Sequence, residues 1–155
     1  MKVLAEIEGK VYGALSAATP ADFTSPFPGR PFLCLLWDHE GRASDADRST
    51  LARALLEAGC RYAVCGGRDC EAWHDAFDAE FIRKNGPGEP DDSTHVITTW
   101  HDGESPAEVA FFFVDCTGPG GPSFKDHLVL HIGEGEAKTA LESAVARYAL
   151  DKTAD

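Results

Sequence analysis

The chain has 155 residues, of which 43% are hydrophobic and 26% are charged, and these proportions are typical of one globular domain. Its 26 acidic and 14 basic side chains leave a formal charge of −12, so the average surface repels a phosphate backbone and no nucleic-acid partner is expected. No uncharged apolar run is long enough to cross a membrane, and Glu6 and Glu8 interrupt the N-terminus where a secretory signal needs an apolar core.

We therefore expect a cytoplasmic protein without a membrane partner. The five cysteines are odd in number and form no Cys-x-x-Cys pair, which argues against a disulfide framework and against a zinc knuckle. Most of them are expected to be buried thiols. Cys70 is expected to open a helix, where the positive end of the helix dipole would lower the pKa of its thiol.

The first 30 residues predict two short strands and an irregular link. Val3 to Glu8 and Lys10 to Leu15 are interpreted as strands around Gly9 that can pair as an edge hairpin. Residues 19–30 are rich in proline, glycine and serine, which is typical of an irregular connection. We expect one domain over residues 1–155, with its core of alternating strands and helices in residues 31–150.

Residues 31–59 predict a strand followed by a helix. Pro31 to Trp37 is a continuous apolar run, which is typical of a strand buried on both faces. Ser44, with Asp47 three positions later, can cap a helix whose apolar residues recur at helical spacing, and Gly59 is placed to end it.

A second strand and helix follow directly. Arg61 to Cys65 predicts the strand, which leads into a Gly-Gly-Arg-Asp turn whose Asp69 is placed to cap the next helix. Trp73, Phe77 and Phe81 form a one-sided apolar stripe, so that helix is expected to bury this face and to end near Asn85.

Residues 95–115 repeat the pattern. His95 to Thr99 is rich in β-branched residues and predicts a strand. Ser105, Pro106 and Glu108 combine an N-cap, a proline at the first helical position and a reciprocal acidic cap, which predicts a helix from Pro106 to Asp115. The three phenylalanines at 111–113 also fit a strand, and this alternative stays open.

The last part of the chain predicts one more strand and helix. Leu128 to Ile132 is interpreted as the strand before Gly133. The final helix carries an apolar stripe over nearly four turns, and we expect its charged residues to face water: Glu136, Lys138, Glu142 and Arg147.

Alternating strands and helices with short links imply right-handed crossovers and parallel strands. The fold class expected is therefore α/β, with a three-layer, doubly wound and mostly parallel sheet that is Rossmann-like or flavodoxin-like. The order of the strands does not follow from the sequence. In such folds ligands bind beyond the carboxyl ends of the strands, near the point where the strand order reverses.

That rule selects the segments that follow the predicted strands. We expect them to bring candidate ligand-binding residues to one edge of the sheet: Asp38, His39, Gly66, Gly67, Arg68, Asp69, Thr99, Trp100, His101 and Asp102. The two glycines let the backbone approach a ligand, the following helix offers free N–H groups to an anion, and Arg68 can add a bidentate phosphate contact.

Val64 to Asp69, with the sequence VCGGRD, resembles the first strand and turn of Rossmann-like nucleotide-sensor domains of the SLOG type. The resemblance implies nucleotide binding at this turn. In that family a second glycine-rich loop with an acidic residue follows the next strand, whereas here the corresponding strand leads to TTWHD. The Trp-His-Asp segments also resemble uncharacterised bacterial domains, a resemblance that implies no function.

A metal site is chemically conceivable at the same edge of the sheet. Five side chains there could ligate a divalent ion: Asp38, His39, His101, Asp102 and Glu134. However, no compact spacing ties two ligands to one helix face, and acids at helix starts are expected from the helix dipole alone. We therefore expect neither a metal nor another cofactor. His95, His127 and His131 are interpreted as structural residues in or near strands.

Two functional hypotheses remain, because the sequence contains neither a Gly-x-Ser-x-Gly elbow nor a phosphate-binding Walker loop. The first is a non-catalytic acidic binding module, regulatory or immunity-like, that docks a basic protein partner on its acidic segments and uses Trp100 as an anchor. These segments run from Asp38 to Asp47, from Asp69 to Glu80 and from Asp102 to Glu108. The second is a small phosphorylated-ligand or nucleotide site, with or without a metal, in which Arg68 clamps the anion and His101 acts as acid or base.

Overall fold

The computed structural model describes residues 1–19, 22–88, 95–117 and 124–152. In chain order the elements are β1 (Lys2–Ile7), β2 (Lys10–Ala17), β3 (Phe32–Asp38), α1 (Asp45–Ala58), β4 (Cys60–Gly67), α2 (Cys70–Asn85), β5 (Ile97–Trp100), α3 (Pro106–Phe111), the π-helical η2 (Phe112–Cys116), β6 (Asp126–Ile132) and α4 (Ala137–Asp151). Within these ranges no helix is both long and apolar enough to cross a membrane.

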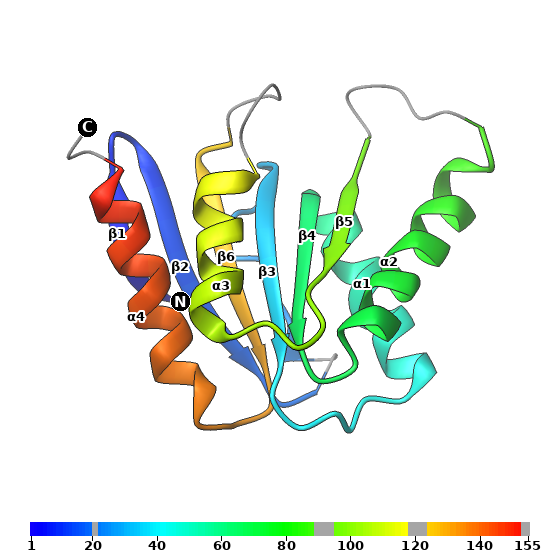
Figure 1. Cartoon of the computed structure of the whole chain (residues 1–155). Helices are drawn as coiled ribbons and strands as arrows, with labels where there is room; N and C mark the ends of the chain where they lie inside the picture. Colours follow the sequence, from blue (N-terminus) through cyan, green and yellow to red (C-terminus); the bar gives the residue numbers. More distant parts are fainter. Residues whose placement is uncertain (20–21, 89–94, 118–123, 153–155) are drawn as a thin grey trace.

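The strands form one six-stranded sheet in the order β1-β2-β6-β3-β4-β5 (Figure 1). Strand β1 pairs antiparallel with β2, and every other neighbouring pair is parallel. The expected α/β class with a mostly parallel sheet is therefore confirmed. The N-terminal hairpin is also present, but of its two strands only β1 lies at an edge of the sheet, because β2 extends to Ala17 and pairs with β6.

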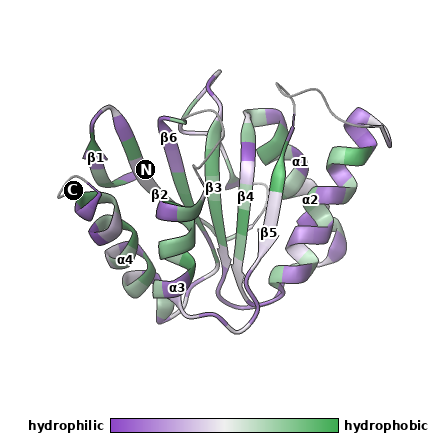
Figure 2. Cartoon of the chain, turned by 45° about the horizontal axis from the view of Figure 1, so that its top comes forward, coloured by the Kyte–Doolittle hydropathy of each residue, from purple (hydrophilic) through white to green (hydrophobic). Residues whose placement is uncertain are grey.

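Helices cover both faces of this sheet. Helices α1 and α2 pack on one face, where Leu51, Leu55 and Trp73 are fully buried, and α3 and α4 pack on the other, where Val109 and Val145 are fully buried. Strand β3 lies between the two cores, and all seven of its residues are buried. In Figure 2 this strand is coloured as hydrophobic along most of its length, while the helices carry both kinds of residue. The predicted three-layer arrangement is thus the observed one.

Helix boundaries follow the predicted caps at two sites. Ser44 with Asp47, and Ser105 with Glu108, both form complete capping boxes, and Gly59 ends α1 in the left-handed conformation. The segment around the three phenylalanines is helical rather than a strand, although its second half, η2, is a π-helix.

The predicted side-chain cap of α2 by Asp69 is wrong. Asp69 stands at the N-cap position, but it has a left-handed backbone with φ of 54°, and its side chain makes no capping hydrogen bond to the described residues. A side-chain cap needs an extended backbone at the N-cap residue. The local pattern correctly indicated the position of the helix start but not the conformation of the turn before it.

Candidate functional site

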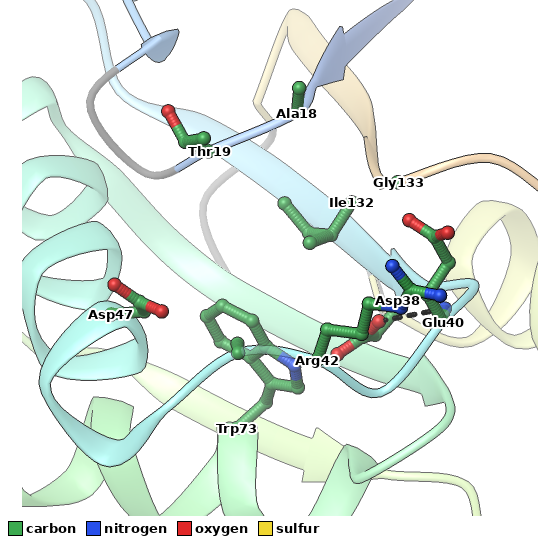
Figure 3. Close-up of a pocket in the computed structure, with 10 residues that line it drawn as sticks. Ala18, Thr19, Asp38, Glu40, Arg42, Asp47, Trp73, Ile132 and Gly133 are labelled. Atoms are coloured by element: carbon green, nitrogen blue, oxygen red, sulfur yellow. Dashed lines mark hydrogen bonds between the residues drawn. The ribbon is translucent and has the colours of Figure 1, made fainter.

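The strand order reverses between β3 and β6 at the carboxyl edge of the sheet. Helix α1 follows β3 on one face and α4 follows β6 on the other, which is the arrangement that opens a ligand crevice in doubly wound sheets. A cavity of about 270 Å³ opens beside this point (Figure 3). It is lined by the ends of β3 and β6, the residues after β2, helices α1 and α2, and the loop between β3 and α1.

Asp38, one of the predicted site residues, lies in the wall of this cavity but is committed to holding the local structure. It is 1% exposed. Its Oδ1 accepts hydrogen bonds from the backbone N–H groups of Glu40 at 3.1 Å and Gly41 at 2.8 Å, and its Oδ2 accepts one from Nε1 of Trp73 at 2.9 Å. Three donors stabilise a buried carboxylate without a metal. Asp38 therefore fixes the loop after β3 to α2.

His39, the next predicted residue, belongs to a hydrogen-bonded chain on the other face of the sheet. Its Nε2 lies 2.9 Å from Nδ1 of His131, which lies in β6. Nε2 of His131 lies 2.8 Å from Oε2 of Glu142 in α4, and Nζ of Lys2 donates to Oε1 of Glu142 at 3.0 Å. Four residues from β1, β6, α4 and the end of β3 are thus joined in one network.

Burial shapes the protonation of this network. Removal from water lowers the pKa of both His39 and His131, while the neighbouring carboxylate of Glu142 acts against this on His131. The pKa of Glu142 is lowered as well, because Lys2 and His131 outweigh the effect of its own burial. The arrangement favours two neutral imidazoles held beside an ionised carboxylate.

Glu142 corrects one expectation, because it does not face water but is only 8% exposed. It follows Leu141 at the border of the apolar stripe of α4. His131 was expected to be structural, and both of its ring nitrogens do have partners. No sequence signal connects it to His39, since the two residues are 92 positions apart and their strands are neighbours only in the fold.

The space beside Gly66 and Gly67 is occupied by other atoms of the protein. A Cβ atom built on Gly66 would lie 2.8 Å from the ring of Trp37, and one on Gly67 would lie 2.5 Å from the backbone oxygen of Asp38. The backbone N–H of Arg68 also donates to that same oxygen at 2.8 Å. The two glycines are thus explained by the close approach of β3, while the Arg68 side chain is exposed.

The predicted residues after β5 form a separate cluster. Both ring nitrogens of His101 have partners within its own segment, with Nε2 3.0 Å from Oγ1 of Thr99 and Nδ1 2.8 Å from Oε2 of Glu104. His101 is 7% exposed and packs against Phe112. His101 and His39 both follow strands at the carboxyl edge, but their hydrogen-bond partners differ, so they belong to different hydrogen-bonded networks.

Trp100 lies on the outside of the same edge. It is 46% exposed, whereas Trp37 and Trp73 are buried. Its ring packs on His74 at a centroid distance of 4.5 Å, and His74 contacts the carboxylates of Asp75 and Asp78 at 3.2 and 3.4 Å. We call these four residues, Trp100, His74, Asp75 and Asp78, the Trp100 patch.

The segments that follow four of the five parallel strands, β3, β4, β5 and β6, make an acidic edge. We call it the carboxyl rim (residues 39–44, 68–69, 101–105 and 133–136). Its exposed carboxylates are Glu40, Asp69, Asp102, Glu104, Glu134 and Glu136, and its exposed cations are Arg42 and Arg68. Two acids of the predicted acidic docking segments are buried, Asp38 and Glu80, and Glu80 pairs there with Arg53 and Arg83.

Metal binding and thiol chemistry find little support at this edge. Among the described residues no group of three or more histidine, cysteine, aspartate or glutamate side chains could hold a metal ion. Cys70 is buried, and desolvation raises the pKa of its thiol, contrary to the expected lowering by the helix dipole. All five cysteines are free, and only Cys116 is exposed.

The comparisons with known proteins give a family but no activity. A family model described as a domain of unknown function, DUF7684, matches residues 12–148, which include most of β2, all of β3 to β6 and most of α4. None of the curated proteins matches the sequence. The chain belongs to the DUF7684 family.

Proposed function

We propose that this member of the DUF7684 family is a non-catalytic binding module, regulatory or immunity-like, that docks a basic protein partner on its carboxyl rim and the adjoining Trp100 patch. The observation that carries the proposal is Trp100, a large aromatic side chain that is 46% exposed at the acidic edge of the sheet. Exposed aromatic residues surrounded by polar groups are the usual anchors of protein interfaces.

The Trp100 patch combines an anchor with charge. The side chain of His74, on which the indole packs, is itself only 16% exposed, so the ring of Trp100 rests on a packed base rather than projecting freely. Asp75 and Asp78 lie in α2 together with His74, contact its ring and add two exposed carboxylates to the patch. A partner that presents an apolar pocket bordered by lysine or arginine side chains would complement this patch.

Charge supports the proposal over a longer range. Six exposed carboxylates against two arginines give the carboxyl rim a negative potential, in line with the formal charge of −12 of the whole chain. Such a field accelerates the encounter with a positively charged protein and repels acidic ones. We place this encounter in the cytoplasm, because five free thiols suit a reducing compartment.

Site-specific crosslinking tests the proposal even though the partner is unidentified. A photoreactive amino acid is introduced at Trp100 and, as a matched control, at Val3, which is 53% exposed on the opposite edge strand β1. In cells of the native host, we expect position 100 to crosslink to a basic protein and position 3 not to do so. The adduct should disappear when Asp75 and Asp78 are both changed to asparagine. The same adducts at both positions, or an acidic protein at position 100, would contradict the proposal.

A second candidate is a small phosphorylated ligand or nucleotide at the turn before α2. It is favoured by the exposed Arg68, whose side chain has no hydrogen bond or ion pair with the described residues, and by the missing side-chain cap of the 16-residue helix α2. In a thermal-shift screen against nucleotides and sugar phosphates, Arg68→Ala should abolish any stabilisation, and Arg147→Ala, which removes an exposed arginine from α4, should not. A shift that survives Arg68→Ala would exclude this site.

A further inference from the structure

The cavity at the strand reversal is separate from the Trp100 patch. Its volume of about 270 Å³ lies just below the roughly 300–1,000 Å³ of pockets that hold drug-sized ligands. It opens where parallel sheets of this class bind small molecules, between the ends of β3 and β6. Its size and position suit one small molecule, and its lining indicates which kind.

The lining contains acidic and basic side chains whose charged groups are available to a ligand. The side chains of Glu40 and Arg42 make no hydrogen bond or ion pair with any described residue. Asp47 uses its Oδ2 to accept from the backbone N–H of Ser44 at 3.1 Å, which leaves Oδ1 available. Asp38, by contrast, is buried and already accepts three hydrogen bonds from protein donors, so we assign it to the wall rather than to the ligand contacts.

Figure 3 shows how these groups are distributed around the cavity. Asp47 projects from α1 on one side, and Glu40 and Arg42 lie on the other side, toward Gly133. Between them the wall is apolar, since Trp73 and Ile132 line it. The charged groups thus face each other across an apolar surface.

We propose that this cavity binds a free α-amino acid. The Arg42 guanidinium is suited to pair with the α-carboxylate, because its N–H groups match the two carboxylate oxygens in a fork. Glu40, on the same side of the cavity as Arg42, accepts a hydrogen bond from the ammonium group, and the amino acid side chain lies along Trp73 and Ile132 toward Asp47. With three carboxylates and one guanidinium in the lining, the cavity disfavours a phosphate and requires an ammonium group in the ligand.

Calorimetric titration of the whole chain with each of the standard amino acids, at up to about 10 mM, tests the proposal. At least one amino acid should bind, and Arg42→Ala should lower its affinity by at least about tenfold, the loss of one charge-assisted contact. Arg147→Ala, the matched loss of an exposed arginine elsewhere, should leave the affinity unchanged. The amide of the same amino acid, which lacks the carboxylate, and its N-acetyl derivative, which lacks the ammonium, should both fail to bind.

Two results would overturn the proposal. One is the failure of every amino acid to bind to protein that is folded by circular dichroism; the other is binding that is equally strong in the Arg42→Ala variant. The Trp100→Ala variant should bind the amino acid as the unmodified chain does, because Trp100 does not line the cavity. Failure of amino acid binding and failure of partner docking are therefore separate outcomes.

Discussion

Glu142 determines which nitrogen of the His39–His131 pair carries each proton. Its carboxylate accepts from Nε2 of His131, so in the neutral pair Nδ1 of His131 has the lone pair and Nε2 of His39 must donate to it. The remaining lone pair is on Nδ1 of His39. This nitrogen lies close to Gly135, since a Cβ atom built on Gly135 would be 2.8 Å from it. The pair can take up one proton at that nitrogen without breaking its internal hydrogen bond, but a second proton would place two N–H groups face to face.

This pair should make the stability of the protein depend on pH. Because burial lowers the pKa of both imidazoles below the usual 6.5, the unfolded chain binds more protons than the folded chain below that pH. The free energy of unfolding should therefore fall as the pH is lowered from about 7 to about 5. The carboxylates of Asp38, Glu40 and Glu134 raise the pKa of His39 and so reduce this effect. Lys138 lowers that pKa and so adds to it.

Urea unfolding at the two pH values measures the effect. His39→Gln should flatten the dependence, whereas His95→Gln, at an exposed histidine, should leave it unchanged. His127 contributes in the same direction over this range and further down to about pH 4, since burial lowers its pKa from 6.5 to about 4. An unchanged pH dependence in His39→Gln would show that the pair does not titrate as described.

Asp38 and Trp73 should be energetically coupled. Asp38→Ala removes the acceptor of the buried Nε1–H of Trp73 and of two backbone donors, so it should lower the free energy of unfolding by roughly 2–4 kcal/mol. Asp102→Ala, at an exposed acid, should change it by less than about 0.5 kcal/mol. A double-mutant cycle with Trp73→Phe measures the coupling, and strictly additive losses would argue against the hydrogen bond.

Gly67 and Gly86 form a matched pair for the turn before α2. Both have φ of 79°, but a Cβ on Gly67 would lie 2.5 Å from the Asp38 oxygen, whereas no described atom lies within 4 Å of a Cβ on Gly86. Alanine at Gly86, which has φ of 79° and ψ of 176°, should cost only the backbone strain of this glycine-favoured region, about 1–3 kcal/mol. Alanine at Gly67 should cost clearly more in the same denaturation experiment, and equal costs would mean that the turn has room for a side chain.

Local patterns in the sequence predicted the elements well. The capping boxes at Ser44 and Ser105 and the glycine at 59 depend on neighbouring residues, so they can be recognised in the sequence. The apolar run of β3 correctly indicated a strand buried on both faces. Elements defined by contacts within a few residues were therefore predictable, including the α/β class that follows from their alternation.

Relationships between distant residues were not predictable. The insertion of β6 between β2 and β3 brings His131 beside His39 and places the cavity, and no local pattern encodes that strand order. Glu142 was assigned to water because helical spacing alone cannot distinguish the border of an apolar stripe from its exposed side. The carboxyl edge was identified correctly as a region, but its histidines divide between two networks.

Neutralising the Trp100 patch should slow association with the partner rather than unfold the protein. Asp75→Asn with Asp78→Asn removes two exposed carboxylates, and Glu6→Gln with Glu57→Gln removes two exposed carboxylates away from the rim, so both variants have the same net charge. Surface plasmon resonance should show a lower association rate constant and a weaker salt dependence for the first variant only. Equal rates would mean that only the overall charge matters.

The most direct test of docking through Trp100 is the dissociation constant of the partner, captured by crosslinking and then purified, for Trp100→Ala and for Val3→Ala. Both changes truncate an exposed apolar side chain on an edge strand, at opposite ends of the sheet. We predict that Trp100→Ala weakens binding by at least about 30-fold, near 2 kcal/mol, and that Val3→Ala has no measurable effect. If the two variants bind the partner as tightly as the unmodified chain, the Trp100 patch and the adjoining carboxyl rim are not the docking surface.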